Sequence, residues 1–253
     1  MATLADIRRH PVKGLGDEAL ASVSLSAGAP LPFDRFWAVA HGQSGFDPAA
    51  PDWRPCRETM RVSLEPDMAQ ARTRYDEATG RMTLSHPDLG EVEADPKTEG
   101  AKFCDWLAPL AGKKADGPYS LISAAPEALV DVREAHVSVA SLSSLRALSD
   151  MAGVDLDMRR FRMNLWLDDL APWEELDWVG REVSVGAARL RIIDRDERCI
   201  ATHANPESGA RDVEVTKVLY DRLGHMDFGL YAQVVADGDV AIGDVVSAGQ
   251  VAS

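Results

Sequence analysis

The sequence lacks any long apolar run, so no segment of it predicts a helix that crosses a bilayer. Its first residues show no charged segment followed by an apolar stretch, and we expect no secretory signal. A phosphate loop, a dinucleotide-binding glycine motif and a nucleophile elbow are also absent. These absences argue against a membrane-spanning protein and against enzymes built on those three motifs.

Cysteine is scarce and histidine is scattered. The three cysteines, Cys56, Cys104 and Cys199, are far apart and odd in number, so no disulfide framework is expected. A reducing cytoplasm is the simpler location. No cysteine cluster is spaced to hold an iron–sulfur centre, and the 6 histidines form no close pair that predicts a metal site. If the protein is a redox enzyme, its electrons come from another polypeptide.

Basic residues are also few relative to acidic ones. The chain of 253 residues has 27 Lys and Arg against 41 Asp and Glu, a net charge of −14. Such a chain is repelled by nucleic acid and by anionic membranes, so we expect neither as a partner. An anionic ligand therefore needs a local basic island. The candidate islands are Arg8, Arg9 and His10; Arg159, Arg160 and Arg162; and Arg195 and Arg198.

Short alternating segments dominate the first half. Val23 and Leu25 predict one strand, residues 60–64 another, and Met82 and Leu84 a third after a turn at 78–80. Residues 33–40 predict a more buried strand, and residues 44–55, with four Gly or Pro, predict a loop. A helix is expected over residues 98–110, with Ala101, Cys104, Leu107 and Ala108 on its apolar face. The polar stretch 111–118 then predicts a boundary.

The second half mixes strands with two helices. Strands are expected over 136–140 and 162–168, a hairpin over 183–193 around Gly186, and a strand pair over 230–235 and 240–246. Ser141 predicts the start of a helix that Gly153 ends, and Gly224 ends a second helix bearing Val215 and Leu219. The pattern predicts an α+β, mostly β fold with a barrel-like core and peripheral helices. We expect two domains, at residues 1–115 and 116–253.

Cys199 is the sharpest chemical candidate. A thiolate is a soft metal ligand, and cations such as Arg198, Arg195 and His203 favour it. An isolated cysteine is, however, more often a small buried apolar residue. Cys104 lies on an apolar helix face and predicts a core residue. Cys56 also has basic neighbours, so local charge does not single out Cys199.

Several polar residues are candidates for an anion site. The helix start at Ser141 suits a phosphate, although an ordinary helix cap is commoner. Arg162 and Asn164, two apart in an apparent strand, point to one face and offer a fork and an amide, or else form a plain surface pair. Lys13 and Arg35 are further cations near apolar residues. None of these residues is distinctive alone.

Seven segments are specific through their order and spacing together. They read His-Pro-Val-Lys-Gly at 10–14, Asp-Arg-Phe-Trp-Ala-Val at 34–39, Ala-Ser-Leu-Ser-Ser-Leu at 140–145, Arg-Phe-Arg-Met-Asn at 160–164, Arg-Cys-Ile-Ala-Thr at 198–202 with Asn-Pro and Gly by 209, Phe-Gly-Leu-Tyr at 228–231 and Ile-Gly-Asp at 242–244. This series resembles the MOSC domain proteins with an N-terminal β-barrel-like extension. That family includes the mitochondrial amidoxime-reducing component and bacterial relatives, and the likeness covers nearly the whole chain.

The resemblance implies a MOSC-type β-barrel core with peripheral helices, preceded by an N-terminal β-rich domain. It implies that the molybdenum cofactor, a molybdopterin, is bound through residues matching the family pattern: Lys13, Arg35, Ser141, Arg162, Asn164, Arg198 and Thr202. Cys199 is then the metal ligand and the catalytic residue. The family is also associated with pyridoxal phosphate binding.

The implied activity is reduction of N-hydroxylated compounds, small molecules whose reduction draws electrons from a separate redox protein. A carrier of cofactor, or of sulfur as a persulfide on Cys199, is the alternative. A structural relative without cofactor is a third hypothesis, against which the retained Arg162, Asn164, Arg198 and Cys199 argue. The chain departs from the pattern at Gly14, where a serine hydroxyl is lost, at Met163, which replaces proline, and at residues 54–58, which leave the substrate range open.

Overall fold

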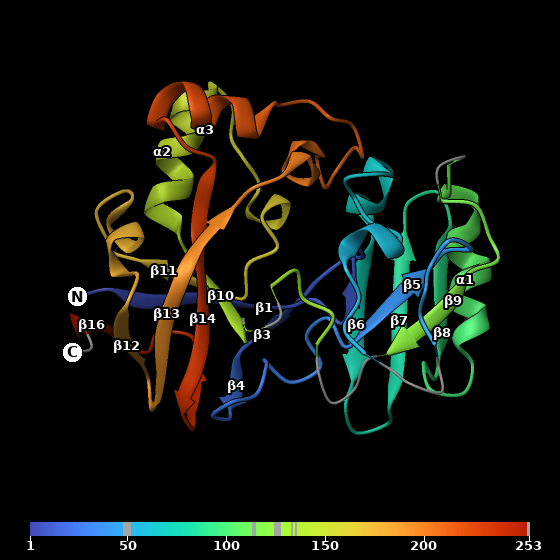
Figure 1. Cartoon of the computed structure of the whole chain (residues 1–253), viewed down its shortest axis with the longest axis horizontal. Helices are drawn as coiled ribbons and strands as arrows, with labels where there is room; N and C mark the ends of the chain where they lie inside the picture. Colours follow the sequence, from blue (N-terminus) through green and yellow to red (C-terminus); the bar gives the residue numbers. More distant parts are fainter. Residues whose placement is uncertain (48–51, 113–114, 124–127, 133, 135, 252–253) are drawn as a thin grey trace.

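Most of the regular structure is β-sheet, arranged as two bodies that lie side by side (Figure 1). The computed structural model describes the chain except residues 48–51, 113–114, 124–127, 133, 135 and 252–253. Part of the predicted loop 44–55, and Lys113 and Lys114 of the predicted boundary, lie outside the described residues. The mostly β fold with barrel-like sheet and peripheral helices is confirmed.

The larger body is built on a curled, half-barrel sheet of eight strands. Their order across the sheet is β16 (Val246–Val251), β12 (Arg181–Val185), β13 (Ala188–Glu197), β14 (Asp227–Ala236), β10 (Val137–Ser141), β11 (Leu165–Asp168), β1 (Thr3–Arg9) and β3 (Glu18–Leu20). All neighbours pair antiparallel except β10 and β11. Because β1 and β3 come from the start of the chain, the first residues are part of the sheet formed mainly by the second half.

The smaller body holds two three-stranded sheets. One is β2 (Val12–Lys13), β5 (Trp37–Ala40) and β9 (Ser120–Ser123); the other is β6 (Arg72–Asp76), β7 (Arg81–His86) and β8 (Gly90–Ala94). Helix α1 (Gly100–Leu107) packs on β8 and β9, with Cys104 and Leu107 in the core. Ala101, expected on the same face, is exposed. Burial raises the pKa of the Cys104 thiol to about 11, as expected for a core cysteine.

The two helices of the larger body follow local sequence rules. Helix α2 (Leu142–Ala152) starts at Ser141, whose hydroxyl accepts hydrogen bonds from two helix N–H groups, and it ends at Gly153 with a φ of 71°. Helix α3 (Val215–Leu223) ends at Gly224, with a φ of 79°. Both helices pack on one face of the sheet, over a core that includes Trp166 and Phe228. Their predicted boundaries and apolar faces are confirmed.

One predicted strand is wrong and another is confirmed only in its second half. Residues 60–64 form turns, in which Arg61 O accepts the N–H of Leu64 and of Glu65. Met60 and Val62 are still buried in the core, while Arg61 between them is only partly buried. This alternation in burial resembles that of a strand. Residues 33–40 form a strand only over β5, since Phe33 and Arg35 have positive φ values of 60° and 48°.

One predicted pairing is also wrong. The predicted turn at residues 237–239 is absent, since only Asp237 separates β14 from the next strand, and β14 pairs with β10 and β13. That next strand, β15 (Gly238–Ala241), pairs instead with β4 (Ser22–Leu25). The hairpin around Gly186, by contrast, is present as β12 and β13. No helix within the described residues is long and apolar enough to cross a membrane.

Candidate functional site

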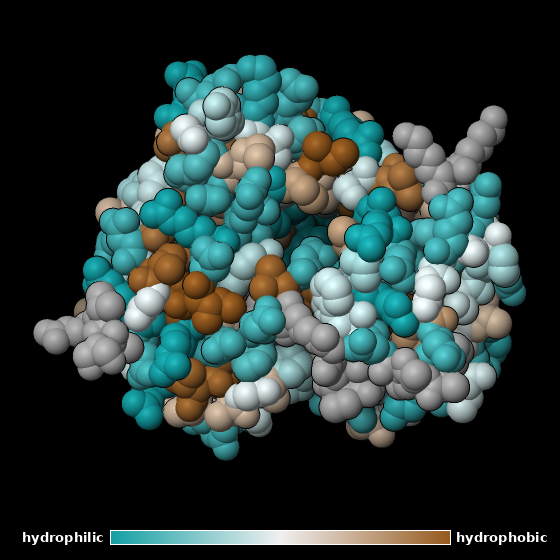
Figure 2. Space-filling model, viewed as in Figure 1, coloured by the Kyte–Doolittle hydropathy of each residue, from teal (hydrophilic) through white to brown (hydrophobic). Residues whose placement is uncertain are grey.

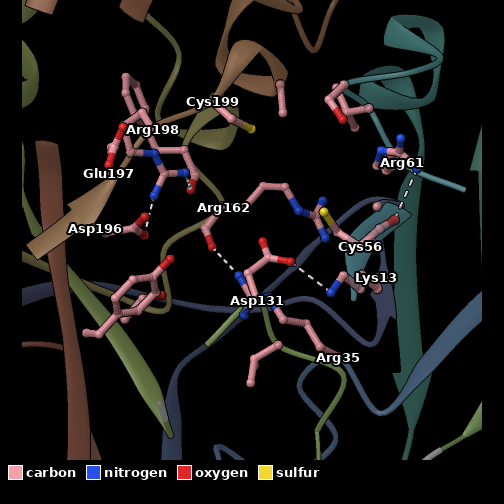
Figure 3. A pocket seen from close by; sticks show the side chains of 18 of the residues that line it. Lys13, Arg35, Cys56, Arg61, Asp131, Arg162, Asp196, Glu197, Arg198 and Cys199 are labelled. Carbon is pink, nitrogen blue, oxygen red and sulfur yellow. Dashed lines mark hydrogen bonds and ion pairs between the residues drawn. The ribbon is translucent and has the colours of Figure 1, made fainter. Parts of the chain in front are cut away.

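A cavity of about 330 Å³ opens between the two bodies, where the face shown in Figure 2 is hollowed. Its walls come from segments that are far apart in the sequence. Lys13 is the last residue of β2, and Cys56 begins the short 3-10 helix Cys56–Glu58. Cys199 follows β13 and precedes the 3-10 helix Ile200–His203. Figure 3 shows these side chains around one space. The cavity therefore exists only because the two bodies pack together.

The cavity is cationic although the chain is acidic. Its described lining residues include six cations, Lys13, Arg35, Arg61, Arg160, Arg162 and Arg198, and three carboxylates, Asp131, Asp196 and Glu197. Cations therefore outnumber carboxylates by three among the lining residues of a protein whose net charge is −14. Two of these cations, Arg35 and Arg160, also pair with Asp34 and Asp212 behind the wall. A concave site with such an excess attracts anions and stabilises them more than an open surface does.

Arg162 lies in this cluster of cations. Its guanidinium donates to the carbonyl oxygens of Gly16 at 3.1 Å and of Val12 and Leu15 at 3.4 Å, and it forms no ion pair with any described carboxylate. Burial and the nearby Arg35 lower the pKa of Arg162 to about 10. An anion placed here would relieve that repulsion.

The predicted strand that placed Arg162 and Asn164 on one face is wrong at its start. Arg162 has a φ of 54° and precedes β11, so its side chain turns toward the cavity. Asn164 is buried and does not line the cavity. Its Oδ1 accepts from the N–H and Oγ of Ser138, at 3.0 and 2.9 Å, and its Nδ2 donates to Arg8 O at 3.1 Å. Asn164 therefore braces three neighbouring strands.

Lys13 and Arg35 form part of the cavity wall. The Lys13 Nζ atom lies 2.8 Å from Asp131 Oδ1. Arg35 pairs with the buried Asp34 and donates to Arg162 O at 2.6 Å. Gly14, which follows Lys13 in the sequence, has a φ of 77°, and a Cβ there would lie 2.7 Å from Met60 O. Position 14 thus requires glycine in this chain for steric reasons.

Cys199 is exposed and its sulfur points into the cavity (Figure 3). The neighbouring Arg198 pairs with Asp196, donates to Phe161 O at 2.5 Å, and lies 5.8 Å from the Phe161 ring centroid. These contacts hold the backbone at the end of β13, so the thiol is presented to the cavity rather than packed into a core.

Thr202 and Ser141 are buried and do not line the cavity. The Thr202 hydroxyl donates to Cys199 O at 2.9 Å and so holds the turn that carries the thiol. The Ser141 hydroxyl caps helix α2, and the buried Glu175 accepts from Ser144 Oγ at 2.9 Å beside the same helix start. Burial raises the pKa of Glu175. The protein's own groups therefore occupy the helix terminus that the sequence suggested for phosphate.

Another wall is formed by the buried Asp196 and the partly buried Tyr231. Asp196 is 5% exposed, and burial raises the pKa of its carboxyl group, although Arg198 and a hydrogen bond with Tyr231 oppose this shift. Burial and the Asp196 charge raise the pKa of Tyr231 in turn. Both side chains therefore present hydrogen-bonding groups to the cavity next to Arg198.

Sequence reasoning missed some of this site. No binding role is predicted for Cys56 from the sequence, although it has basic neighbours as Cys199 does, and both thiols line the same cavity. Arg61 and Asp131 also line it, and no local motif marks them; Tyr231 lines it too and lies in the family segment at residues 228–231. The only available signal was the departure from the family pattern at residues 54–58. No group of three potential metal ligands among His, Cys, Asp and Glu occurs within the described part of the chain.

Two family models together match most of the chain. The family model described as the MOSC domain matches residues 114–247, and the model of the MOSC N-terminal beta barrel domain matches residues 1–110. The chain is 27% identical over 180 residues to a molybdenum cofactor sulfurase of Drosophila willistoni, covering 71% of this chain and 22% of that protein. A second such sulfurase, from Drosophila ananassae, is 28% identical over 120 residues, covering 46% of this chain and 15% of that protein. The chain thus spans at most about a fifth of these relatives.

Two solved structures are similar in outline. The YUAD protein from Bacillus subtilis aligns over 98% of this chain and 96% of its own, with 12% identity and a TM-score of 0.47. YiiM from Geobacillus stearothermophilus aligns over 46% of this chain and 55% of its own, with 16% identity and a TM-score of 0.35.

Proposed function

The chain belongs to the MOSC domain family, and we propose that it holds the molybdenum cofactor in the cationic cavity and uses it to reduce N-hydroxylated compounds. One observation carries the proposal: a cavity with an excess of positive charge in an acidic protein presents an exposed thiol, Cys199, beside Arg198. An anionic, thiophilic ligand meets both properties of this cavity.

The residues that line the cavity fit the molybdenum cofactor. Arg162 has no carboxylate partner among the described residues, and the Nε–H groups of Arg160 and Arg198 are buried without a described hydrogen-bond acceptor. Buried donors of this kind are costly unless a ligand or water accepts from them. Cys199 adds a soft donor suited to a high-valent or late metal. A phosphate and a thiol-bound metal would satisfy both sets of atoms.

Each part of the chain has a role in this proposal. Lys13, Arg35 and Arg162 bind the phosphate and pterin, and Cys199 ligates the metal. Arg198 adds positive charge beside the thiol, while Thr202 fixes its backbone. Ser141 and Asn164 act behind the wall, by capping helix α2 and bracing β10, β11 and β1. When bound, the cofactor supplies two-electron redox chemistry at the metal.

The overall reaction needs two electrons and two protons from outside the substrate. Reduction of an N–OH group breaks the N–O bond, leaves an N–H group and releases water. The sequence has neither a nicotinamide fingerprint nor an iron–sulfur cysteine cluster, so a separate redox protein is the proposed donor. The metal-loaded chain alone should then fail to oxidise NADH, and should turn over with an artificial reductant. Direct NADH-driven turnover would contradict this part of the proposal.

A second candidate is carriage of the cofactor, or of sulfur as a persulfide. The curated relatives are molybdenum cofactor sulfurases, and a second thiol, Cys56, lines the same cavity. The two candidates differ in what leaves the protein. Bound metal with turnover supports the reductase, whereas cofactor released to an acceptor, or sulfane sulfur on a cysteine, supports the carrier.

The deciding experiment is molybdenum and pterin analysis of the chain produced in a host that makes the cofactor. We expect molybdenum and pterin at close to one each per chain. The matched control is Arg222→Ala, which removes an exposed arginine of α3, outside the cavity, and should leave the metal content unchanged. Zinc, or no metal, in the unaltered chain would contradict the proposal.

A further inference from the structure

The Lys13–Asp131 ion pair is asymmetric in its exposure. The Lys13 side chain is 7% exposed and belongs to the wall, whereas the Asp131 side chain is 64% exposed and stands in the cavity. Arg160, another lining cation, pairs with Asp212, which is 37% exposed but lies outside the cavity lining. The carboxylates that pair with Arg35 and Arg198 are only 1% and 7% exposed. Those two carboxylates are built into the protein, while Asp131 has room to move.

Asp131 also lies where the positive charges converge. Burial opposes its ionisation, but Lys13, Arg35 and Arg198 outweigh this and lower the pKa of Asp131. Figure 3 shows the carboxylate between Lys13, Arg35 and Arg162. A point that stabilises a carboxylate also stabilises the anionic group of a ligand, since both respond to the same field.

The two residues before Asp131 are held by hydrogen bonds, and these fix the position of the Asp131 backbone beside the cavity. Leu129 is fully buried and its N–H donates to Arg35 O at 2.8 Å. The indole Nε1–H of Trp53 donates to Val130 O at 2.6 Å. These contacts deliver the Asp131 side chain to the cavity while leaving the carboxylate free to rotate away from Lys13.

From this geometry we infer that Asp131 is a built-in counter-ion that occupies the anion subsite and that the anionic group of the ligand displaces it. The inference rests on the proposed function only in taking the ligand to be anionic. Asp131 thereby sets the affinity of the site, because every anion that binds must first break the Lys13–Asp131 pair. Removing this carboxylate leaves the cations in place and removes the competitor.

The test is calorimetric titration of the full chain with inorganic phosphate, at constant ionic strength and near pH 8. We expect Asp131→Asn to bind phosphate on the order of tenfold more tightly than the unaltered chain. The matched control is Asp221→Asn, which makes the same charge change in the exposed Lys217–Asp221 pair of α3 and should alter affinity less than twofold. Circular dichroism checks that each variant is folded, and Asp131→Ala should tighten binding in the same direction.

The outcomes separate this inference from the proposed function. Equal or weaker phosphate binding by Asp131→Asn and Asp131→Ala, with binding by the unaltered chain intact, overturns the displacement inference and leaves the anion site standing. Equal tightening by Asp221→Asn overturns it also, because net charge alone then explains the effect. No phosphate binding by any variant counts against the anion site itself. Loss of binding in Arg162→Ala identifies the cavity as the place where phosphate binds.

Discussion

Arg35 donates a 2.6 Å hydrogen bond from its guanidinium to the main-chain carbonyl oxygen of Arg162. Both residues have positive φ values, 48° and 54°, and both line the cavity. The contact brings two cations together, and the resulting repulsion contributes to the lowered pKa of Arg162. The protein thus holds two like charges close to each other at some cost, which an anionic ligand would offset.

The first prediction concerns Arg162. We expect Arg162→Ala to weaken cofactor retention by about ten- to a hundredfold, since a charge-assisted contact to a phosphate contributes about 1.5–3 kcal/mol. Arg162→Lys should retain part of the affinity, because it keeps the charge but loses the fork. Molybdenum content after dilution and gel filtration measures the effect. Unchanged occupancy in Arg162→Ala would show that the cofactor does not contact this residue.

The second prediction concerns the thiols. Cys199→Ser should stay folded, because the side chain is exposed, and should lose reductase activity together with sulfur-to-metal charge-transfer absorption. Cys104→Ser is the control for stability, since it places a hydroxyl in the core at a cost of roughly 1–3 kcal/mol. Cys56→Ser tests the other thiol of the cavity and should keep the absorption. If Cys56→Ser alone abolishes activity, the metal ligand was assigned to the wrong cysteine.

The third prediction separates helix capping from cofactor binding at Ser141. Ser141→Ala should lower the free energy of unfolding by about 1 kcal/mol, because α2 loses its N-terminal hydrogen bonds. Cofactor retention should stay within twofold of the unaltered chain, since Ser141 is buried away from the cavity. Denaturant unfolding and metal analysis measure the two effects. A large loss of cofactor at unchanged stability would show direct contact with the phosphate.

The fourth prediction concerns pH and His10. This ring is fully buried beside Arg162 and Arg35, and burial followed by these two charges places its pKa well below 6.5. At pH values between that lowered pKa and 6.5, His10 is protonated in the unfolded chain but neutral in the folded chain. The contribution of His10 to the free energy of unfolding is therefore fully present above roughly pH 7. It falls as the pH drops, by up to about 1.4 kcal/mol per pH unit.

His10→Gln should remove this contribution and flatten the dependence of the unfolding free energy on pH between roughly pH 5 and 7. His136 and His203 also have lowered pKa values, so some slope should remain in the variant. The measurement is urea unfolding at several pH values in both proteins. Identical slopes would mean that His10 takes up its proton as readily in the folded state as in the unfolded state.

Much of the local structure follows from the sequence. The start of α2 at Ser141, the ends of α2 and α3 at Gly153 and Gly224, and the hairpin at Gly186 depend on neighbours within a few residues. Capping hydrogen bonds, left-handed glycines and apolar periodicity act over that range. The ordered series of family segments likewise pointed to the MOSC fold, and the two family models confirm it.

The tertiary structure alone decided which residues share the cavity. Lys13 meets Asp131, and Cys56 comes to the same space as Cys199, although more than 100 residues separate each pair. Residues 60–64 predict a strand because apolar and polar residues alternate there, but they form turns in the structure. Strand β15 pairs with β4 because the larger body brings the start and end of the chain together. Backbone preferences are local, whereas the field at a point sums every charge near it in space. The sequence therefore determined the elements and the kind of residue available, and packing determined where an anion can be held.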